Sequence, residues 1–404
     1  MIPLLSILIA TKNRQKYCLS AVESILMLSD DNIEVIVQDN SDDTNLENLI
    51  SPYLQDNRLT YRYTPPPFSS IDNFNAALEL ASGEYVCLIG DDDGINPEIV
   101  KATQWAKDNH VDCLVGSVNV LYRWEGTGAP DTLFTRMKGS TLTITHFDGK
   151  AKRVNIEKSY ENFKRNGCTN YLEFSFPKFY HGIVRKALFD EIRAQTGAYI
   201  KGLSPDIYSA MALSLKAKNI IEIDYPLTMP GVCGQSTSIT EGQLKKHSKK
   251  LEDAPHFRDR KEPYQWTQEV PKIYCVQTIW ADSGFAAMRE FGQEHIFDGF
   301  DRYMLCANIL DADPSLEEMV YDYLKKTYPD VSIVKHKKNL KIAKLTGPLP
   351  KFIKNRALGR LKKMLKLESF VIIDNVPDMV AATKTLTGYL SQCKIDFINE
   401  LEKI

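Results

Sequence analysis

Short apolar runs alternate with segments of helical spacing along the first 120 residues. The runs predict buried strands over 5–10, 33–37, 59–63, 84–89 and 111–120. Between them, apolar residues spaced three or four apart predict helices over 15–29, 45–54, 70–82 and 97–109. This alternation is typical of a doubly wound α/β fold built on a mostly parallel sheet.

The pattern becomes less regular after residue 120 and then mainly helical. It predicts β-like pieces over 121–124 and 140–147, helices over 185–194 and 204–218, a strand over 220–225, and helical segments over 271–310, 314–328 and 376–403. A polar stretch over 240–263 predicts a loop or a solvated helix. We therefore expect an α/β domain over 1–240, a mainly helical extension over 241–334, and a basic amphipathic and helical C-terminal region over 335–404.

The composition excludes several classes of protein and hides an uneven charge. With 43% apolar and 25% charged residues, the chain is neither disordered nor collagen-like. Its eight cysteines form no CxxC pair, which disfavours zinc and thioredoxin chemistry and indicates reduced thiols in the cytoplasm. No apolar stretch approaches the roughly 20 residues of a membrane span, and the apolar start lacks the basic region of a signal peptide. The net charge of -2 hides two segments of opposite charge. Residues 1–100 contain 5 basic and 16 acidic residues, whereas residues 335–366 contain 12 basic residues and no acidic one.

Three polar turns follow predicted strands: Thr11–Arg14, Asp39–Asp43 and Asp91–Asp93. Ligands of open α/β sheets bind outside the carboxyl ends of the strands, so we expect these turns to meet. Three adjacent carboxylates repel one another unless a cation neutralises them, and carboxylate and diphosphate oxygens suit Mg²⁺ or Mn²⁺. An ordinary acidic surface turn is the alternative.

Segments 6–14, 34–43 and 81–93, in this order and spacing, resemble family 2 glycosyltransferases of the GT-A fold. The resemblance implies a doubly wound mixed sheet, a nucleotide-sugar donor, UDP-linked by preference, and Mn²⁺ or Mg²⁺ as cofactor. It implies Asp93 as the metal ligand and an Asp39 contact with the base. The expected nucleotide-binding residues are Thr11, Asn13, Arg14, Asp39, Asn75, Asp91 and Asp92. Where the family often has Arg before the Asn of the preceding helix, this chain has Phe74.

Asp206 is the expected general base of an inverting transfer. Ser204 as N-cap and Pro205 at the first helical position place Asp206 in the first turn of a helix. An ionised carboxylate there can take the proton of an acceptor hydroxyl, or it can simply complement the helix dipole. By resemblance, His181 and Arg185 belong to a segment near the donor sugar, although His181 is equally a structural histidine. Segment 231–238, with Gln235 and Ser236, follows a Pro-bounded strand and is a candidate to close over the diphosphate with N–H and hydroxyl donors, or is equally a polar turn.

The basic segment 335–366 predicts an amphipathic helix at an anionic membrane surface. The alternative is a helix packed on the core with a solvated basic face. Nucleic acid is not expected as a partner, because Phe352 is the segment's only aromatic residue. Residues 376–403 either dock on the core or mediate homo-oligomerisation.

Together these features predict a metal-dependent glycosyltransferase that acts on a saccharide or lipid-linked saccharide at the inner face of the cell membrane. One rival is a sugar-phosphate nucleotidyltransferase, which normally has a Gly-rich loop after the first strand, whereas residues 11–14 contain no glycine. A second is a non-catalytic membrane-bound adaptor with the same fold.

Overall fold

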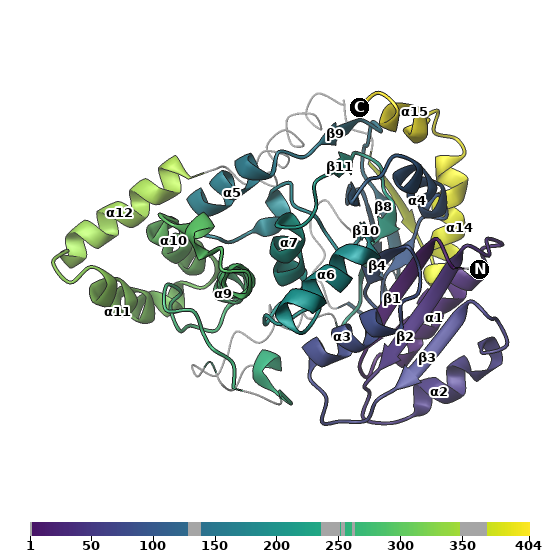
Figure 1. The fold of residues 1–404 in the computed structure, drawn as a ribbon, viewed down its shortest axis with the longest axis horizontal. Helices are drawn as coiled ribbons and strands as arrows, with labels where there is room; N and C mark the ends of the chain where they lie inside the picture. The colour runs from purple at the N-terminus through teal and green to yellow at the C-terminus, as the bar shows by residue number, and fades with distance from the viewer. Residues whose placement is uncertain (1, 128–138, 236–250, 252–254, 261–262, 348–369) are drawn as a thin grey trace.

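A computed structural model describes residues 2–127, 139–235, 251, 255–260, 263–347 and 370–404 (Figure 1). Its centre is an eight-stranded sheet in the order β3-β2-β1-β4-β10-β6-β11-β9. The strands are β1 (Leu5–Thr11), β2 (Ile33–Asp39), β3 (Leu59–Tyr63), β4 (Tyr85–Ile89), β6 (Cys113–Gly116), β9 (Ala151–Arg153), β10 (Gly182–Arg185) and β11 (Ile220–Ile223). Strands β1 to β4 are parallel, whereas β10 runs antiparallel to both β4 and β6. The sheet is therefore mixed, and its parallel half is formed by the first four strands of the chain, β1 to β4.

Helices cover both faces of this sheet, because successive residues of a strand point to opposite sides. Along β1, Ile7 and Ile9 belong to one buried cluster and Leu8 to the other. The first cluster includes α1 (Gln15–Leu26), α2 (Asn45–Ile50) and α4 (Ile99–Asp108). The second includes α3 (Ser70–Leu80), α5 (Ile156–Arg165), α6 (Lys186–Thr196) and α7 (Pro205–Ser214). Two cores on one sheet confirm the predicted doubly wound α/β architecture.

A helical extension continues the second core away from the sheet. It contains α9 (Val276–Glu290), α10 (Arg302–Ala312), α11 (Glu317–Thr327) and α12 (Ile333–Thr346). Figure 1 shows α12 at the end of the molecule farthest from the parallel strands. The single helical pattern over 271–310 is two helices, since Gly292 and Gly299 adopt φ values of +62° and +71° between them. In the part of the chain that the structure describes, every helix is too short or too polar to span a bilayer.

The C-terminal segment 371–404 returns to the sheet domain. Strand β14 (Val371–Asp374) pairs with β8 (Thr141–Ile144) in a four-stranded sheet that also contains β7 (Val120–Arg123) and β13 (Gly231–Val232). Helix α14 (Met379–Leu390) packs on α1, and α15 (Phe397–Leu401) packs on β9. Of the two roles left open for 376–403, the structure shows docking on the core.

The structure divides the C-terminal region that we expected over 335–404. Helix α12 joins the helical extension, whereas 371–404 completes the sheet domain. The rest of the predicted amphipathic segment, 348–366, lies outside the described residues. The strand predicted over 111–120 is likewise split into β6 and β7, because Asn119 turns the chain by hydrogen bonds from its amide to Ser117 and Asp224.

Candidate active site at the carboxyl edge of the sheet

The parallel register brings the three polar turns together. Thr11 lies opposite Asp39, and Ile9 lies opposite Ile89. Asp91, two residues after Ile89, is therefore level with Thr11. The Thr11 hydroxyl donates a hydrogen bond of 2.7 Å to the Asp91 carboxylate. The turns that were expected to meet do meet.

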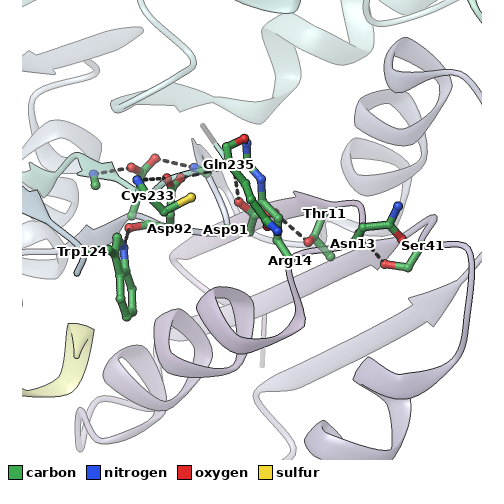
Figure 2. Close-up of polar contacts among 12 residues, drawn as sticks. Thr11, Asn13, Arg14, Ser41, Asp91, Asp92, Trp124, Cys233 and Gln235 are labelled. Carbon is green, nitrogen blue, oxygen red and sulfur yellow. Dashed lines mark hydrogen bonds and ion pairs between the residues drawn. The ribbon is translucent and has the colours of Figure 1, made fainter. Parts of the chain in front are cut away.

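Asn13 and Asp39 shape the side of the site formed by β1 and β2. The Asn13 amide exchanges hydrogen bonds of 2.8 and 2.9 Å with Asp42, and its backbone N–H donates to Ser41 Oγ at 2.8 Å (Figure 2). Asp39 is fully buried and accepts from the Ser41 N–H at 2.8 Å and the Tyr61 hydroxyl at 2.9 Å. These hydrogen bonds fix the orientation of polar side chains where the base of a nucleotide was expected.

Arg14 supplies a fixed positive charge to the acidic turn. Its Nη1 lies 2.9 Å from Asp91 Oδ1 and 3.6 Å from Asp92 Oδ1, and its Nη2 donates to the Gln235 carbonyl (Figure 2). Burial raises the pKa of Asp91 to about 6, although Arg14 opposes the shift. The two buried carboxylates and the guanidinium form a partly neutralised cluster at the carboxyl edge of the sheet.

Asp93 is held by four donors. They are the backbone N–H groups of Gly90 at 2.5 Å and Gly231 at 2.6 Å, the Tyr180 hydroxyl at 2.7 Å, and His181 Nε2 at 3.3 Å. Burial alone would raise the pKa of Asp93, but His181 and the hydrogen bonds bring it below its usual value. Asp93 is therefore an ionised carboxylate in a defined orientation.

The segment after β12 (Thr228–Met229) closes over the acidic turn. The Gly231 N–H binds Asp93, the Cys233 N–H binds Asp92 at 3.1 Å, and the Trp124 indole donates to the Asp92 carbonyl at 2.8 Å. A Cβ atom on Gly231 would lie only 1.7 Å from the Asp92 carbonyl oxygen, so the close approach requires glycine. The backbone amides of this segment bind carboxylates rather than standing free. Ser236, expected here, lies outside the described residues.

Asp206 lies in the first turn of α7, and its carboxylate is free to accept a proton or a hydrogen bond from a ligand. Within the described residues no hydrogen bond reaches this carboxylate, although Ser209 binds the backbone carbonyl. Desolvation by its neighbours raises the pKa of Asp206 to about 6, an effect that His181 opposes and Asp93 reinforces. His181 also contacts the Thr228 hydroxyl through Nδ1 at 3.0 Å. The histidine thus joins Asp93 electrostatically to Asp206.

The loop before α7 is anchored from two sides. The Asn75 side chain accepts from the N–H groups of Tyr199 and Ile200, both at 3.0 Å, and donates to the carbonyls of Ile71 and Ile200. Ser283 Oγ of α9 accepts from the N–H groups of residues 203 and 204 at 3.1 and 2.9 Å. Asn75, expected at the nucleotide, makes three of its four hydrogen bonds to this loop and the fourth to Ile71 of its own helix.

Arg185 lies away from the other predicted site residues. It pairs in register with Tyr85, at the amino end of β4, and its Nη2 lies 2.6 Å from Asp112. There it lines a surface hollow of about 620 Å³ together with Lys107 and Glu84. The structure does not bring Arg185 to the acidic turn.

The donor set of the acidic turn fits a divalent cation that arrives with phosphate. The guanidinium of Arg14 already occupies a position between Asp91 and Asp92, which shows that the two carboxylates accept a shared positive centre. Among the described residues, no group of three or more His, Cys, Asp or Glu side chains is placed to hold a metal ion. Mg²⁺ and related ions commonly bind through one or two carboxylates and substrate phosphates, and this arrangement needs no protein cage.

Comparison with known proteins gives one family match. Residues 6–187 match glycosyl transferase family 2. The chain is 23% identical over 199 residues to glycosyltransferase GlyG of Streptococcus pneumoniae serotype 4, a match that covers 49% of this chain and 62% of that protein. The chain therefore spans less than two thirds of this relative.

Among the solved structures that resemble this chain, two serve as examples of distant similarity. One is S. aureus TarS 1–349 in complex with UDP-GlcNAc, at 17% identity and a TM-score of 0.42, covering 84% of this chain and 79% of that one. The other is mannosyltransferase PcManGT from Pyrobaculum calidifontis in complex with GDP-Man and Mn²⁺, at 12% identity and a TM-score of 0.40, covering 86% and 87%. The family match and the mixed doubly wound sheet confirm the expected GT-A fold with its helical C-terminal region.

Proposed function

We propose that this chain, of which residues 6–187 match glycosyl transferase family 2, transfers a sugar from a nucleotide-sugar to a saccharide hydroxyl. The observation that carries the proposal is the pairing of two carboxylates with different roles. Asp93 is ionised and held by four donors, whereas Asp206 has a raised pKa and no hydrogen bond from the described residues. Carboxyl groups whose environments move their pKa values apart are typical of acid–base sites.

The donor binds along the edge formed by the ends of β1, β2 and β4. Asp39 and Asn13 form the wall for the base, and UDP is the preferred nucleotide by the resemblance of this edge to the family. Thr11, Asp91 and Arg14 face the ribose and diphosphate. Mn²⁺ or Mg²⁺, held by Asp93 and the adjacent carboxylates, would offset the negative charge of the leaving diphosphate when bound.

Asp206 removes the proton of the acceptor hydroxyl. As the proton passes to the carboxylate, the acceptor oxygen forms a bond to the anomeric carbon and the bond from that carbon to the diphosphate oxygen breaks. Attack from the face opposite the leaving group inverts the anomeric configuration. With a pKa of about 6, Asp206 is about nine-tenths ionised at pH 7 and still basic enough to accept a proton.

We further propose that the acceptor is a saccharide or lipid-linked saccharide at the inner face of the cell membrane. The support is the basic stretch 335–366, of which the structure describes the part in α12. A membrane-borne acceptor would bring enzyme and substrate to one surface.

A donor screen tests this function. Thermal unfolding is measured with Mn²⁺ and a panel of UDP-, GDP- and dTDP-sugars, since a ligand at 100 times its Kd adds about 2.7 kcal/mol of stability. We expect one nucleotide class to raise the Tm, and the same sugar to be hydrolysed or transferred by the wild type. Asp206→Asn should keep the shift in Tm and lose turnover. If no nucleotide-sugar changes the Tm, the proposed function is wrong.

A further inference from the structure

Helix α12 has an outer face that combines exposed aliphatic side chains with lysines. Four of the eleven exposed large apolar side chains that the structure describes belong to this helix: Ile333, Val334, Ile342 and Leu345. Val334 is 79% exposed and Leu345 is 85% exposed. Single exposed aliphatic residues are ordinary on a protein surface, so the question is which of the four share one side of the helix. Ile333 and Ile342 are nine residues apart and lie on opposite sides of it.

The two most exposed of these aliphatic residues, Val334 and Leu345, lie on one stripe with two exposed lysines. Val334, Lys338, Lys341 and Leu345 are spaced by four, three and four residues, which places them on one side of an α-helix over about 16 Å at ~1.5 Å per residue. We call these four residues the α12 stripe. Its two ends are apolar and its middle is basic.

The opposite side of α12 is already packed. His336, Leu340 and Ala343 are buried against α10 and α11, and His336 Nδ1 lies 3.0 Å from the Tyr303 hydroxyl. Because this inner face anchors the helix, the α12 stripe is held outward. Figure 1 places α12 at the end of the helical extension.

The charge of the helix selects one kind of partner. The helix contains five lysines and no acidic residue. The adjoining residues 348–369 carry seven Lys or Arg and one Glu, so the sequence that follows the helix is basic as well. Nucleic acid would satisfy the lysines but leave Val334 and Leu345 in water, whereas an anionic lipid interface accepts both.

We propose that the α12 stripe docks on an anionic bilayer, with Val334 and Leu345 inserted among the headgroups and Lys338 and Lys341 near lipid phosphates. This docking surface would bring the enzyme to the membrane-borne acceptor proposed above, and its role in sugar transfer rests on that proposed function. Vesicle binding, however, is measured apart from sugar transfer, so the two proposals can fail separately.

Vesicle flotation of the full chain tests the proposal, with phosphatidylcholine vesicles compared with vesicles containing 30% phosphatidylserine. The wild type should bind the anionic vesicles only. K338Q/K341Q should bind about 25-fold more weakly, since each lysine near an anionic surface contributes about fivefold. V334S/L345S should also bind more weakly. The matched control is K158Q/K384Q, which removes two exposed lysines from α5 and α14 and should bind like the wild type.

Three results would overturn the proposal. One is wild-type affinity for anionic vesicles in both stripe variants. Another is equal binding of the wild type to neutral and anionic vesicles. A third is a dimer in sedimentation equilibrium that V334S/L345S converts to a monomer with vesicle binding unchanged, because the stripe would then join two copies of the chain. Hydrolysis of the nucleotide-sugar, measured without vesicles, should be the same in all of these variants, and its absence in the wild type would instead contradict the proposed function.

Discussion

Replacing Asp206 with Asn should make the protein more stable while it abolishes transfer. The amide has nearly the shape of the carboxylate but cannot accept a proton at neutral pH. General base catalysis contributes typically 10²- to 10⁴-fold to a rate, so we expect a loss of that order in turnover. Donor binding should be unchanged, since the carboxylate makes no hydrogen bond with the described residues around the acidic turn.

The gain in stability follows from the raised pKa of Asp206. Its folded pKa of about 6, against 3.8 for an unperturbed Asp carboxyl, corresponds at about 1.36 kcal/mol per unit to a cost of about 3 kcal/mol when the group is ionised. A carboxylate in the first turn of a helix recovers roughly 0.3–1 kcal/mol from the dipole, and Asn loses that contribution. We therefore expect Asp206→Asn to raise the free energy of unfolding by about 2 kcal/mol.

The sign of the pH dependence is specific. Between pH 3.8 and about 6 the folded protein keeps the Asp206 proton while the unfolded chain releases it, so wild-type stability contributed by this group falls as the pH rises. The advantage of Asp206→Asn should grow from about pH 4 to pH 6 and stay constant above. The stability is measured by urea unfolding at pH 4.5 and 7.5 with chelator present.

The matched control is Glu157→Gln, which removes an exposed acid from the first turn of α5. It should lose a few tenths of a kcal/mol, because only the interaction with the helix dipole is removed. The reasoning is refuted if Asp206→Asn is less stable than the wild type at pH 7.5, or if its advantage is the same at both pH values. Retained transfer would show that another group is the base.

Two further predictions concern the support of the site. Gly231→Ala should lower the free energy of unfolding by about 3 kcal/mol or prevent folding, because the new Cβ would lie 1.7 Å from the Asp92 carbonyl oxygen. The control Gly388→Ala, in α14 with no atom within 4 Å of the new Cβ, should raise it by up to about 1 kcal/mol. Thermal unfolding measures both. Ser283→Ala removes the acceptor of two buried N–H groups, so it should cost about 1–3 kcal/mol and, by loosening the loop before α7, lower kcat more than it raises the KM for the donor, as steady-state kinetics would show. An unchanged kcat would contradict this positioning role.

The sheet and its ligand edge could be predicted because both depend on local patterns. Apolar runs mark β1, β2 and β4, and the end of each strand is marked by Thr11, Asp39 or Asp91. Once the strands are parallel, their register brings these ends together with no further information. The doubly wound fold and the meeting of the turns followed from this.

Long-range packing could not be predicted in the same way. Strand β14 pairs with β8, more than 220 residues earlier, and nothing in a stretch of four residues specifies that partner. Asn75 and Arg185 matched a motif by position, but their side chains are used at the loop before α7 and at the amino end of β4.

Two supporting residues of the site were not predicted. Tyr180 donates to Asp93, and the only signal of this role in the sequence is its position next to His181. Ser283 lies in a different element, and its role appears only when α9 packs on α7.

The central claim is that the edge around Asp93 binds the donor through a divalent cation. Its most direct test is calorimetric titration of UDP, in the presence of Mn²⁺, into the wild type and into Asp93→Asn, which keeps the size of the side chain. We predict binding to the wild type that disappears when Mn²⁺ is chelated, and at least tenfold weaker binding to Asp93→Asn. Equal affinity of the two proteins for UDP, or UDP binding by the wild type that is unchanged by chelation, would contradict the account.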